Sequence, residues 1–426
     1  MSGEPPATEP TGQPAETTTG RFAPFQYAAY RRYWLGRVVS SAGSAVAPVA
    51  LAFAILHIGG RTSSLGWVLA AATVPQVFFL LIGGVVADRI SRARVLVIAN
   101  LLAAVSEGAF AVLVLAGVAE VWHAIAAAFL TGTASAFIVP ANQGALKTLV
   151  PRSLIKQATA LQRSAMNTTK IGGPALAGLL VSIISPGWVL AGNALSFVLA
   201  AVIIAGIRAD FPAIKVRTFM ADLRYGWREF RSRKWLWYLT AQGSVGVGVW
   251  LVAFQLLGPV YADQSLGGAR AWGMIAASFS VGLLLGSFVS VAWSPDRAGV
   301  AVCVTYAVNG MFPLALALHP DVAVLVLAAA LAGLCLDLAI VSWSTYRQLR
   351  IPDELQSRVE SYNTLGQLLG VPIGYLGAGF AADHFGIAAV GAVLALLVGT
   401  VAAVPLLSPE VRRISIRAVD REPVAV

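Results

Sequence analysis

The chain has 426 residues, of which 58% are hydrophobic and only 12% are charged, and its mean hydropathy is +0.76. Soluble domains carry about 25% charged residues, so this composition excludes an ordinary soluble protein and indicates an integral membrane protein. The net charge of +10 does not indicate a nucleic-acid partner, because the basic residues lie between apolar segments, as in a protein with a basic cytoplasmic face.

Residues 1–20 are rich in Pro, Thr, Gly and Glu and hold hardly any large apolar side chain. Such a composition predicts a disordered tail. It also lacks the basic region and apolar core of a cleavable signal peptide. The abundance of Ala, Gly, Val and Arg over Lys indicates a GC-rich bacterial genome, and therefore the bacterial inner membrane.

Twelve stretches are long and apolar enough to cross a bilayer, which takes about 20 residues. They form two groups of six, so we predict an N-terminal bundle at 21–207, a linker at 208–235, a C-terminal bundle at 236–407 and a tail at 408–426. The predicted spans are 34–57, 65–87, 95–117, 121–145, 159–184, 188–207, 236–261, 271–293, 299–318, 322–345, 360–382 and 387–407.

The basic residues fall on alternate connections between these spans. One set of connections, together with both ends of the chain and the linker, holds nearly all of them, whereas the opposite set holds only Arg61 and Arg270. By the positive-inside rule, both termini face the cytoplasm. In the linker, Leu223, Trp227 and Phe230 recur at helical spacing beside basic residues, which predicts an amphipathic helix on the membrane surface.

The two groups of spans also show an internal repeat. When the chain is shifted by 201 residues, several residues around the fifth span of each half coincide: Pro151 with Pro352, Leu154 with Leu355, and Gly178 with Gly379. Two parallel six-helix halves related by an axis along the membrane normal are one of the known transporter architectures. The predicted fold class is therefore an all-α membrane protein with twelve transmembrane helices in two pseudo-symmetric six-helix bundles.

A short basic turn joins the second and third spans. It holds Gly84, Asp88, Arg89, Arg92 and Arg94. These residues alone also fit an ordinary basic loop, but their pattern resembles the G-x-x-x-D-R-x-G-R-R loop of major facilitator superfamily transporters. Ser91 replaces the second glycine of that pattern, and Ala93 interrupts its basic pair.

The fifth span resembles the antiporter element of the drug-exporting branches of that superfamily. The matching residues are Gly173, Pro174 and Gly178, while Thr169 replaces the leading glycine of the element. Proline bends a helix and glycine lets a neighbouring helix approach closely, so a plain packing face is the alternative.

Three further pieces are similar to the enterobactin-exporter and macrolide-efflux-like branch. They are Tyr30–Gly43, Leu149–Ala158 and Leu223–Trp227, and the resemblance covers residues 25–407. It implies export of small molecules by alternating access. We expect Asp88, a carboxylate among arginines and a helix end, to hold the two halves together on the cytoplasmic side and to release them as the cavity turns, so Asp88→Asn should cut transport. The sequence departs from that branch at three places: Ser44 stands where an acid is common, Gln76 stands where arginine is common, and the fourth span lacks the arginine of proton-coupled exporters. The resemblance therefore does not decide which ion is coupled to transport.

Ionisable residues inside spans are costly and are functional candidates by default. The four are Arg37, Glu107, Lys170 and Asp337. The resemblance places Asp337 on a cavity-lining helix, so it is the first candidate for proton coupling, with Arg37 as its partner and Glu107 as the second candidate. The alternatives are snorkelling of Arg37 to the interface and a structural pair at Asp337.

Neutral polar and aromatic residues complete a mainly apolar cavity, which favours bulky apolar or amphipathic substrates. Each of them also fits a simple packing contact. The candidates are Asn142, Gln143, Gln242, Trp250, Gln255 and Trp343.

The sequence predicts a secondary exporter of drug-, macrolide- or siderophore-like molecules, by proton antiport. We expect a monomer in the lipid bilayer with no cofactor and no metal, since the two cysteines lie in apolar runs and no phosphate-binding loop is present. The alternatives are uptake or lysolipid transport by the same fold, and a polytopic membrane enzyme or sensor. The segment Asp383–Gly386 imitates the basic-loop motif, but it falls on the outer face and is set aside.

Overall fold

The structure is a computed structural model that describes residues 20, 22–89, 91–207, 228, 231–232, 234–293, 295, 297–351 and 353–412. Every regular element within these ranges is a helix, which confirms the predicted fold class. The predicted tail before residue 20, the predicted amphipathic helix around Leu223–Phe230 except residue 228, and the chain beyond 412 lie outside the described residues.

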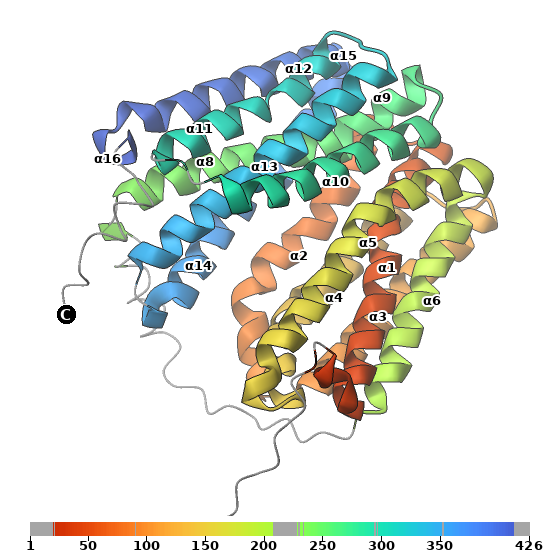
Figure 1. The fold of residues 1–426 in the computed structure, drawn as a ribbon. Coiled ribbons are helices and arrows are strands. Elements are labelled where there is room, and N and C mark those ends of the chain that lie inside the picture. Colours follow the sequence, from red (N-terminus) through yellow and green to blue (C-terminus); the bar gives the residue numbers. More distant parts are fainter. Residues whose placement is uncertain are drawn as a thin grey trace, which may run out of the picture.

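The first bundle holds six long helices (Figure 1). A 3-10 turn, η1 (Ala23–Gln26), precedes them, and a second, η2 (Arg152–Leu154), leads into the fifth. Serine caps two of the helices, because Ser91 Oγ accepts from the Arg94 backbone N–H and Ser185 Oγ from that of Gly187. The six helices are α1 (Ala28–His57), α2 (Thr62–Arg89), α3 (Arg92–Leu115), α4 (Val121–Leu149), α5 (Ile155–Ile183) and α6 (Pro186–Ala205).

The second bundle is built from more pieces. A π-helical turn, η3 (Val252–Leu257), joins α8 (Lys234–Leu251) to α9 (Gly258–Ser265), and the three form one continuous rod. The other elements are α10 (Ala269–Ala292), α11 (Ala298–Val308), α12 (Met311–Ala317), α13 (Val322–Arg350), α14 (Asp353–Leu368), α15 (Val371–Ala403), η4 (Val404–Leu407) and α16 (Pro409–Arg412).

Among the described residues, ten stretches are long and apolar enough to cross a membrane. One of them, Tyr362–Leu407, has 46 residues and is long enough for two crossings. Its backbone breaks at Gly386, where φ is 82° and ψ is 161°, conformations that are essentially reserved for glycine. Helix α5 is not among the ten, because polar residues fill its first half. It is nevertheless 29 residues long and packs against α1 and α10. Twelve crossings are consistent with this arrangement.

Several helices run beyond the predicted spans. The fifth begins at Ile155 instead of 159, and the tenth ends at Arg350 instead of 345. Hydropathy marks only the part of a helix that lies in hydrocarbon, whereas the backbone hydrogen bonds continue through polar residues at the interface.

Apolar side chains cover much of the outer surface. Phe78, Val105, Phe288 and Leu396 are each more than three-fifths exposed. A contiguous apolar exterior of this kind fits contact with lipid. The interior is instead rich in alanine, and small residues allow helices to approach closely where no hydrophobic effect drives them together.

The two bundles touch along two seams, α5 against α10 and α2 against α15. In the first seam, a methyl group added at Gly273 would lie 2.6 Å from the Gly178 Cα. In the second, one added at Gly379 would lie 3.1 Å from the Ser63 Cα. Gly178 and Gly379 are the repeat-related glycines, so the repeat of 201 residues places equivalent close contacts in both seams.

Candidate transport cavity

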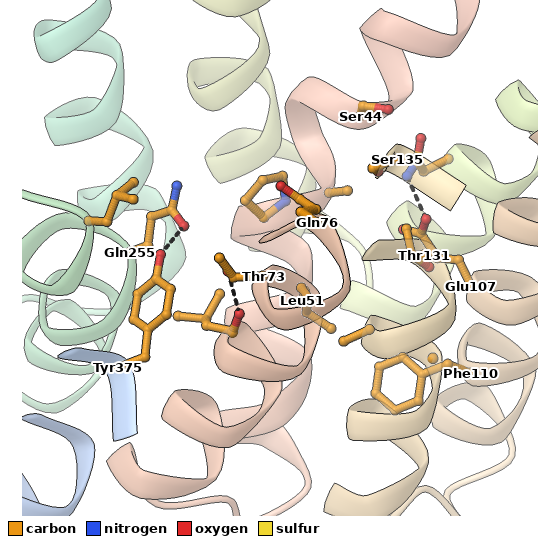
Figure 2. A pocket seen from close by; sticks show the side chains of 18 of the residues that line it. Ser44, Leu51, Thr73, Gln76, Glu107, Phe110, Thr131, Ser135, Gln255 and Tyr375 are labelled. Carbon is orange, nitrogen blue, oxygen red and sulfur yellow. Dashed lines mark hydrogen bonds between the residues drawn. The ribbon is translucent and has the colours of Figure 1, made fainter. Parts of the chain in front are cut away.

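A cavity of about 450 Å³ lies between the bundles. Helices α1, α2, α3, α4 and α6 line it from the first bundle, and α8, η3, α14 and α15 line it from the second. Figure 2 shows Gln255 and Tyr375 on one side and Glu107 and Phe110 on the other. Most of its wall is apolar, from residues such as Leu51, Leu69, Phe110, Phe197, Leu251 and Leu368.

Glu107 is the one acid among the described residues that line this cavity. Its side chain is only 8% exposed, and Asn193 Nδ2 of α6 donates to its Oε2 at 2.7 Å. Asn193 Oδ1 in turn accepts from Ser196 Oγ at 3.2 Å. A carboxyl group in such surroundings is held in place by a single amide donor, and either protonation state keeps an oxygen that can accept from it.

A second polar pair crosses the opposite wall. The Tyr375 hydroxyl of α15 donates to Gln255 Oε1 at 2.8 Å, and both residues line the cavity. Gln255 belongs to the π-helical turn η3. The pair uses the oxygen of Gln255, so its amide N–H groups are the donors that this residue can offer to a ligand, across the cavity from Glu107 (Figure 2).

Comparison with known proteins assigns the family. A family model described as transmembrane secretion effector, of the major facilitator superfamily, matches residues 19–424. The chain belongs to this family. Its relatives include macrolide efflux protein A of Streptococcus pyogenes, 22% identical over 83% of this chain and 89% of that protein. They also include the multidrug efflux pump Tap of Mycolicibacterium fortuitum, 25% identical over 89% of this chain and 95% of the pump.

Solved structures show the same fold. The nucleoside transporter NupG superposes with a TM-score of 0.71 at 12% identity, covering 89% of this chain and 98% of NupG. A POT family transporter superposes with a TM-score of 0.69 at 12% identity, covering 90% and 96%. The chain is thus a multi-pass membrane transporter of the major facilitator superfamily.

The two charged residues predicted as a pair, Arg37 and Asp337, each contact a residue of their own bundle. Asp337 of α13 is half-buried and accepts from Ser287 Oγ of α10 at 3.1 Å. Arg37 of α1 lies beside Met166, with Nη2 3.9 Å from Sδ. Each partner belongs to the same bundle as the charge, and no hydrogen bond or ion pair described joins Arg37 to Asp337. Neither residue is among the described lining of the cavity, whereas Glu107 is.

The six predicted cavity residues divide into four groups. Gln255 lines the main cavity, and Trp250 and Trp343 line a smaller one inside the second bundle. Asn142 is buried within the first bundle, where its Oδ1 accepts from the Tyr33 hydroxyl at 3.1 Å, and Gln242 Oε1 lies 3.8 Å from Cys303 Sγ. The side chain of Gln143 lies outside the described residues.

The basic-loop motif is described only in part. The side chains of Gly84, Asp88 and Arg89 lie outside the described residues, although α2 runs through Arg89. Arg92 begins α3, and the backbone N–H of Arg94 donates to Ser91. The mechanical role expected of Asp88 therefore stays a prediction.

The glycine–proline element lies on two contact faces of α5. Gly173 packs against Ala45 of α1, Pro174 stands inside the helix, and Gly178 packs against Gly273 of α10 in the other bundle. Ser280 Oγ of α10 also donates to the Lys170 carbonyl at 3.2 Å. The element is thus part of the seam between the bundles.

Three residues with evident roles were missed from the sequence. Asn193 is an amide in the apolar sixth span, and Tyr375 is a hydroxyl in the apolar eleventh; both were detectable as polar groups without a local explanation. Asp383 was set aside with its loop. Its carboxylate accepts from the backbone N–H groups of Thr62 and Ser63, each at 3.1 Å, and so caps α2 across the bundle boundary.

Proposed function

We propose that this transporter is a secondary exporter of hydrophobic or amphipathic small molecules, driven by proton entry, in the bacterial inner membrane with both termini in the cytoplasm. The observation that carries the proposal is the main cavity. Its wall is apolar, both bundles contribute to it, and Glu107 is the one acid in its described lining. The relatives are macrolide and multidrug efflux proteins, which supports export as the direction.

The lining favours a ligand with an apolar body and few polar groups. Such a body gains about 25 cal/mol per Å² of apolar surface that leaves water. Glu107 on one wall and the Gln255 amide on the other provide an acceptor and a donor, so an amine-bearing amphipathic molecule fits this cavity better than a sugar or a phosphate.

Glu107 is the residue that we assign to proton coupling. A carboxyl group inside a bilayer is expensive when charged, so binding of a proton and binding of a cationic or donor-bearing substrate compete for the same group. Substrate release on one side and proton release on the other would then alternate as the two bundles rock. Asp337, which contacts Ser287 instead of the cavity, is the second candidate.

Alternating access needs contacts between the bundles that form in one state and break in the other. In Figure 1 the bundles lie close at the end that holds the α9–α10 connection and separate toward the end that holds α14 and the α4–α5 connection. With the proposed topology, this arrangement is closed on the outer side and open toward the cytoplasm. The Asp383 cap and the two glycine seams belong to the closed end.

The test is accumulation of ethidium and of labelled erythromycin in a pump-deficient bacterium that expresses this chain. Export predicts low accumulation that a protonophore raises to the level of cells without the chain. Glu107→Gln should abolish the protonophore-sensitive part, while Asp263→Asn, an exposed acid at the closed end, should leave it intact. Unimpaired export by Glu107→Gln together with loss in Asp337→Asn would move the coupling role to Asp337. Accumulation that never changes, for any of several dyes and macrolides, would contradict the export proposal.

A further inference from the structure

The two seams between the bundles have the same geometry at their closed end. In the α2–α15 seam, a methyl group added at Gly379 would lie 3.2 Å from the Thr62 carbonyl oxygen, at the start of α2. In the α5–α10 seam, one added at Gly178 would lie 2.8 Å from the Ala269 carbonyl oxygen, at the start of α10. The repeat of 201 residues relates the two glycines, so Thr62 and Ala269 occupy equivalent places.

The α2–α15 seam has a charged contact at this end. The Asp383 carboxylate, about one helical turn beyond the glycine of the seam, accepts from the backbone N–H groups of Thr62 and Ser63, each at 3.1 Å. In the α5–α10 seam the repeat-related position is residue 182, which is a serine. A neutral hydroxyl group thus stands where the other seam has a carboxylate.

Ser182 does not cap α10 as Asp383 caps α2. Its Oγ donates to the Leu179 carbonyl oxygen at 2.7 Å, within its own helix. At the start of α10, no side chain caps the helix. No hydrogen bond is described for the backbone N–H groups of Ala269 and Arg270, the first two residues of that helix. The described part of the α5–α10 seam therefore holds no charged contact at its closed end.

A cavity of about 460 Å³ lies at this end of the α5–α10 seam. Ser182, Ala269 and Arg270 line it, together with His57 from the end of α1 and Pro186 from the start of α6. Both bundles therefore contribute to its wall. Atoms that face an unfilled space have no partners there, so they lose the dispersion contacts that would oppose separation of the helix ends.

The α5–α10 seam has a hydrogen bond of its own nearer the middle of the helices. Ser280 Oγ of α10 donates to the Lys170 carbonyl oxygen of α5 at 3.2 Å. At 1.5 Å per residue, Ser280 lies about 16 Å along α10 from its first residue. This contact is far enough from the closed end to persist while that end separates, so it can act as a pivot.

We propose that the outer end opens first along the α5–α10 seam, while the Asp383 cap keeps the α2–α15 seam closed until later in the movement. A carboxylate at a helix N-terminus changes the ratio of closed to open populations by about two- to fivefold, and only one of the two seams has to break such a contact. The inference rests on the alternating access and the topology proposed above. It is independent of the substrate and of the coupling ion.

The experiment compares two distance distributions between spin labels in the full chain, purified in lipid nanodiscs with its two cysteines replaced by serine. Labels at Ile184 and Leu318 span the α5–α10 seam, and labels at Val118 and His384 span the α2–α15 seam. All four side chains are exposed. We expect the fraction at longer distance to be at least twofold larger for the first pair. Equal fractions, or a larger one for the second pair, would overturn the proposal.

Two substitutions exchange the chemistry of the seams. Ser182→Asp supplies a carboxylate beside the start of α10, so we expect the longer-distance fraction of the first pair to fall about two- to fivefold. Ser182→Val is the matched control, because valine is close to aspartate in size and accepts no hydrogen bond, and it should leave that fraction unchanged. Asp383→Ser removes the cap from α2 and should raise the longer-distance fraction of the second pair by a similar factor.

Equal distributions for Ser182→Asp and Ser182→Val would also contradict the proposal. Thermal unfolding midpoints in the same nanodiscs identify a variant that does not fold, and the reciprocal Asp383→Ser variant then still tests the order of opening. A negative result here concerns only that order, so it leaves the accumulation test of export untouched. If the chain fails the accumulation test, the two distances and their response to residue 182 can still be measured.

Discussion

Asp383 of the second bundle caps helix α2 of the first: its Oδ1 lies 3.1 Å from the backbone nitrogen of Thr62, and its Oδ2 lies 3.1 Å from that of Ser63. These N–H groups belong to the first turn of α2, where the helix has no partners of its own for them. The carboxylate therefore satisfies two donors and also opposes the positive end of the helix dipole. The contact exists only while the two bundles are together at this end.

We expect Asp383→Asn to weaken this end of the interface. The amide keeps one acceptor oxygen and loses the charge, which costs about 1 kcal/mol, or roughly a fivefold change in the ratio of closed to open populations. The measurement is the distance distribution between spin labels at Arg61 and Arg270, with Cys303 and Cys335 replaced by serine. Asp263→Asn is the control, and a distribution that Asp383→Asn leaves unaltered would argue against a role in closure.

Gly178→Val should obstruct the seam between α5 and α10. Even a methyl group at this position would lie 2.8 Å from the Ala269 carbonyl oxygen, so a larger side chain forces the helices apart. We expect transport to fall more than tenfold while the chain still reaches the membrane. Gly172→Val on the same helix is the control, because nothing lies within 4 Å of a methyl group there. Equal transport by the two variants would show that the close contact is dispensable.

The hydrogen bond between Asn193 and Glu107 should couple the two side chains energetically. Asn193→Ala removes the donor and leaves the Glu107 carboxyl without its amide partner, so we expect energy-dependent export to fall roughly five- to twentyfold. If the two act as one unit, the double variant with Glu107→Gln should be no worse than Glu107→Gln alone. Effects that simply add, in a full cycle of transport rates, would indicate that Asn193 acts independently of the carboxyl group.

Gly386→Ala should destabilise the second bundle. Its backbone has φ of 82° and ψ of 161°, a conformation that costs a residue with a side chain about 1–3 kcal/mol. We expect a lower midpoint of thermal unfolding in detergent. Gly377→Ala, inside the same helix with nothing within 4 Å of an added methyl group, should not lower it, and equal midpoints for the two variants would contradict the strain argument.

The sequence was sufficient for the spans, their grouping into two bundles and the family, because hydropathy and repeat spacing are local or periodic signals. It also identified Glu107 and Gln255 as polar groups in apolar surroundings. It placed Asp337 first among the proton-coupling candidates and could not reveal that Glu107 lines the cavity, since the lining depends on which face of α3 meets the space between the bundles. That rotation follows from contacts with α6 and α4, which no local pattern encodes.

Asp383 is a second residue whose role depends on a contact that is distant in the sequence. Its segment was recognised as similar to the basic-loop motif and set aside because of its side of the membrane. The partner that gives it a role, the first turn of α2, is more than 300 residues earlier in the chain. Gly178 was predicted as part of an antiporter-like element, with a packing face as the alternative, but its partner helix was not predicted, because a glycine in a sequence does not reveal which helix will approach it.

The π-helical turn Val252–Leu257 has a consequence for how this transporter could change over evolutionary time. A π turn contains one residue more than an α turn. Trp250, just before this turn, lines the smaller cavity inside the second bundle, and Gln255, within the turn, lines the cavity between the bundles. Deleting a single residue here would restore α-helical hydrogen bonding and rotate one part of the rod against the other by about 100°. At this point of the chain, a change in length would alter what the main cavity presents to its ligands more than most changes of residue type.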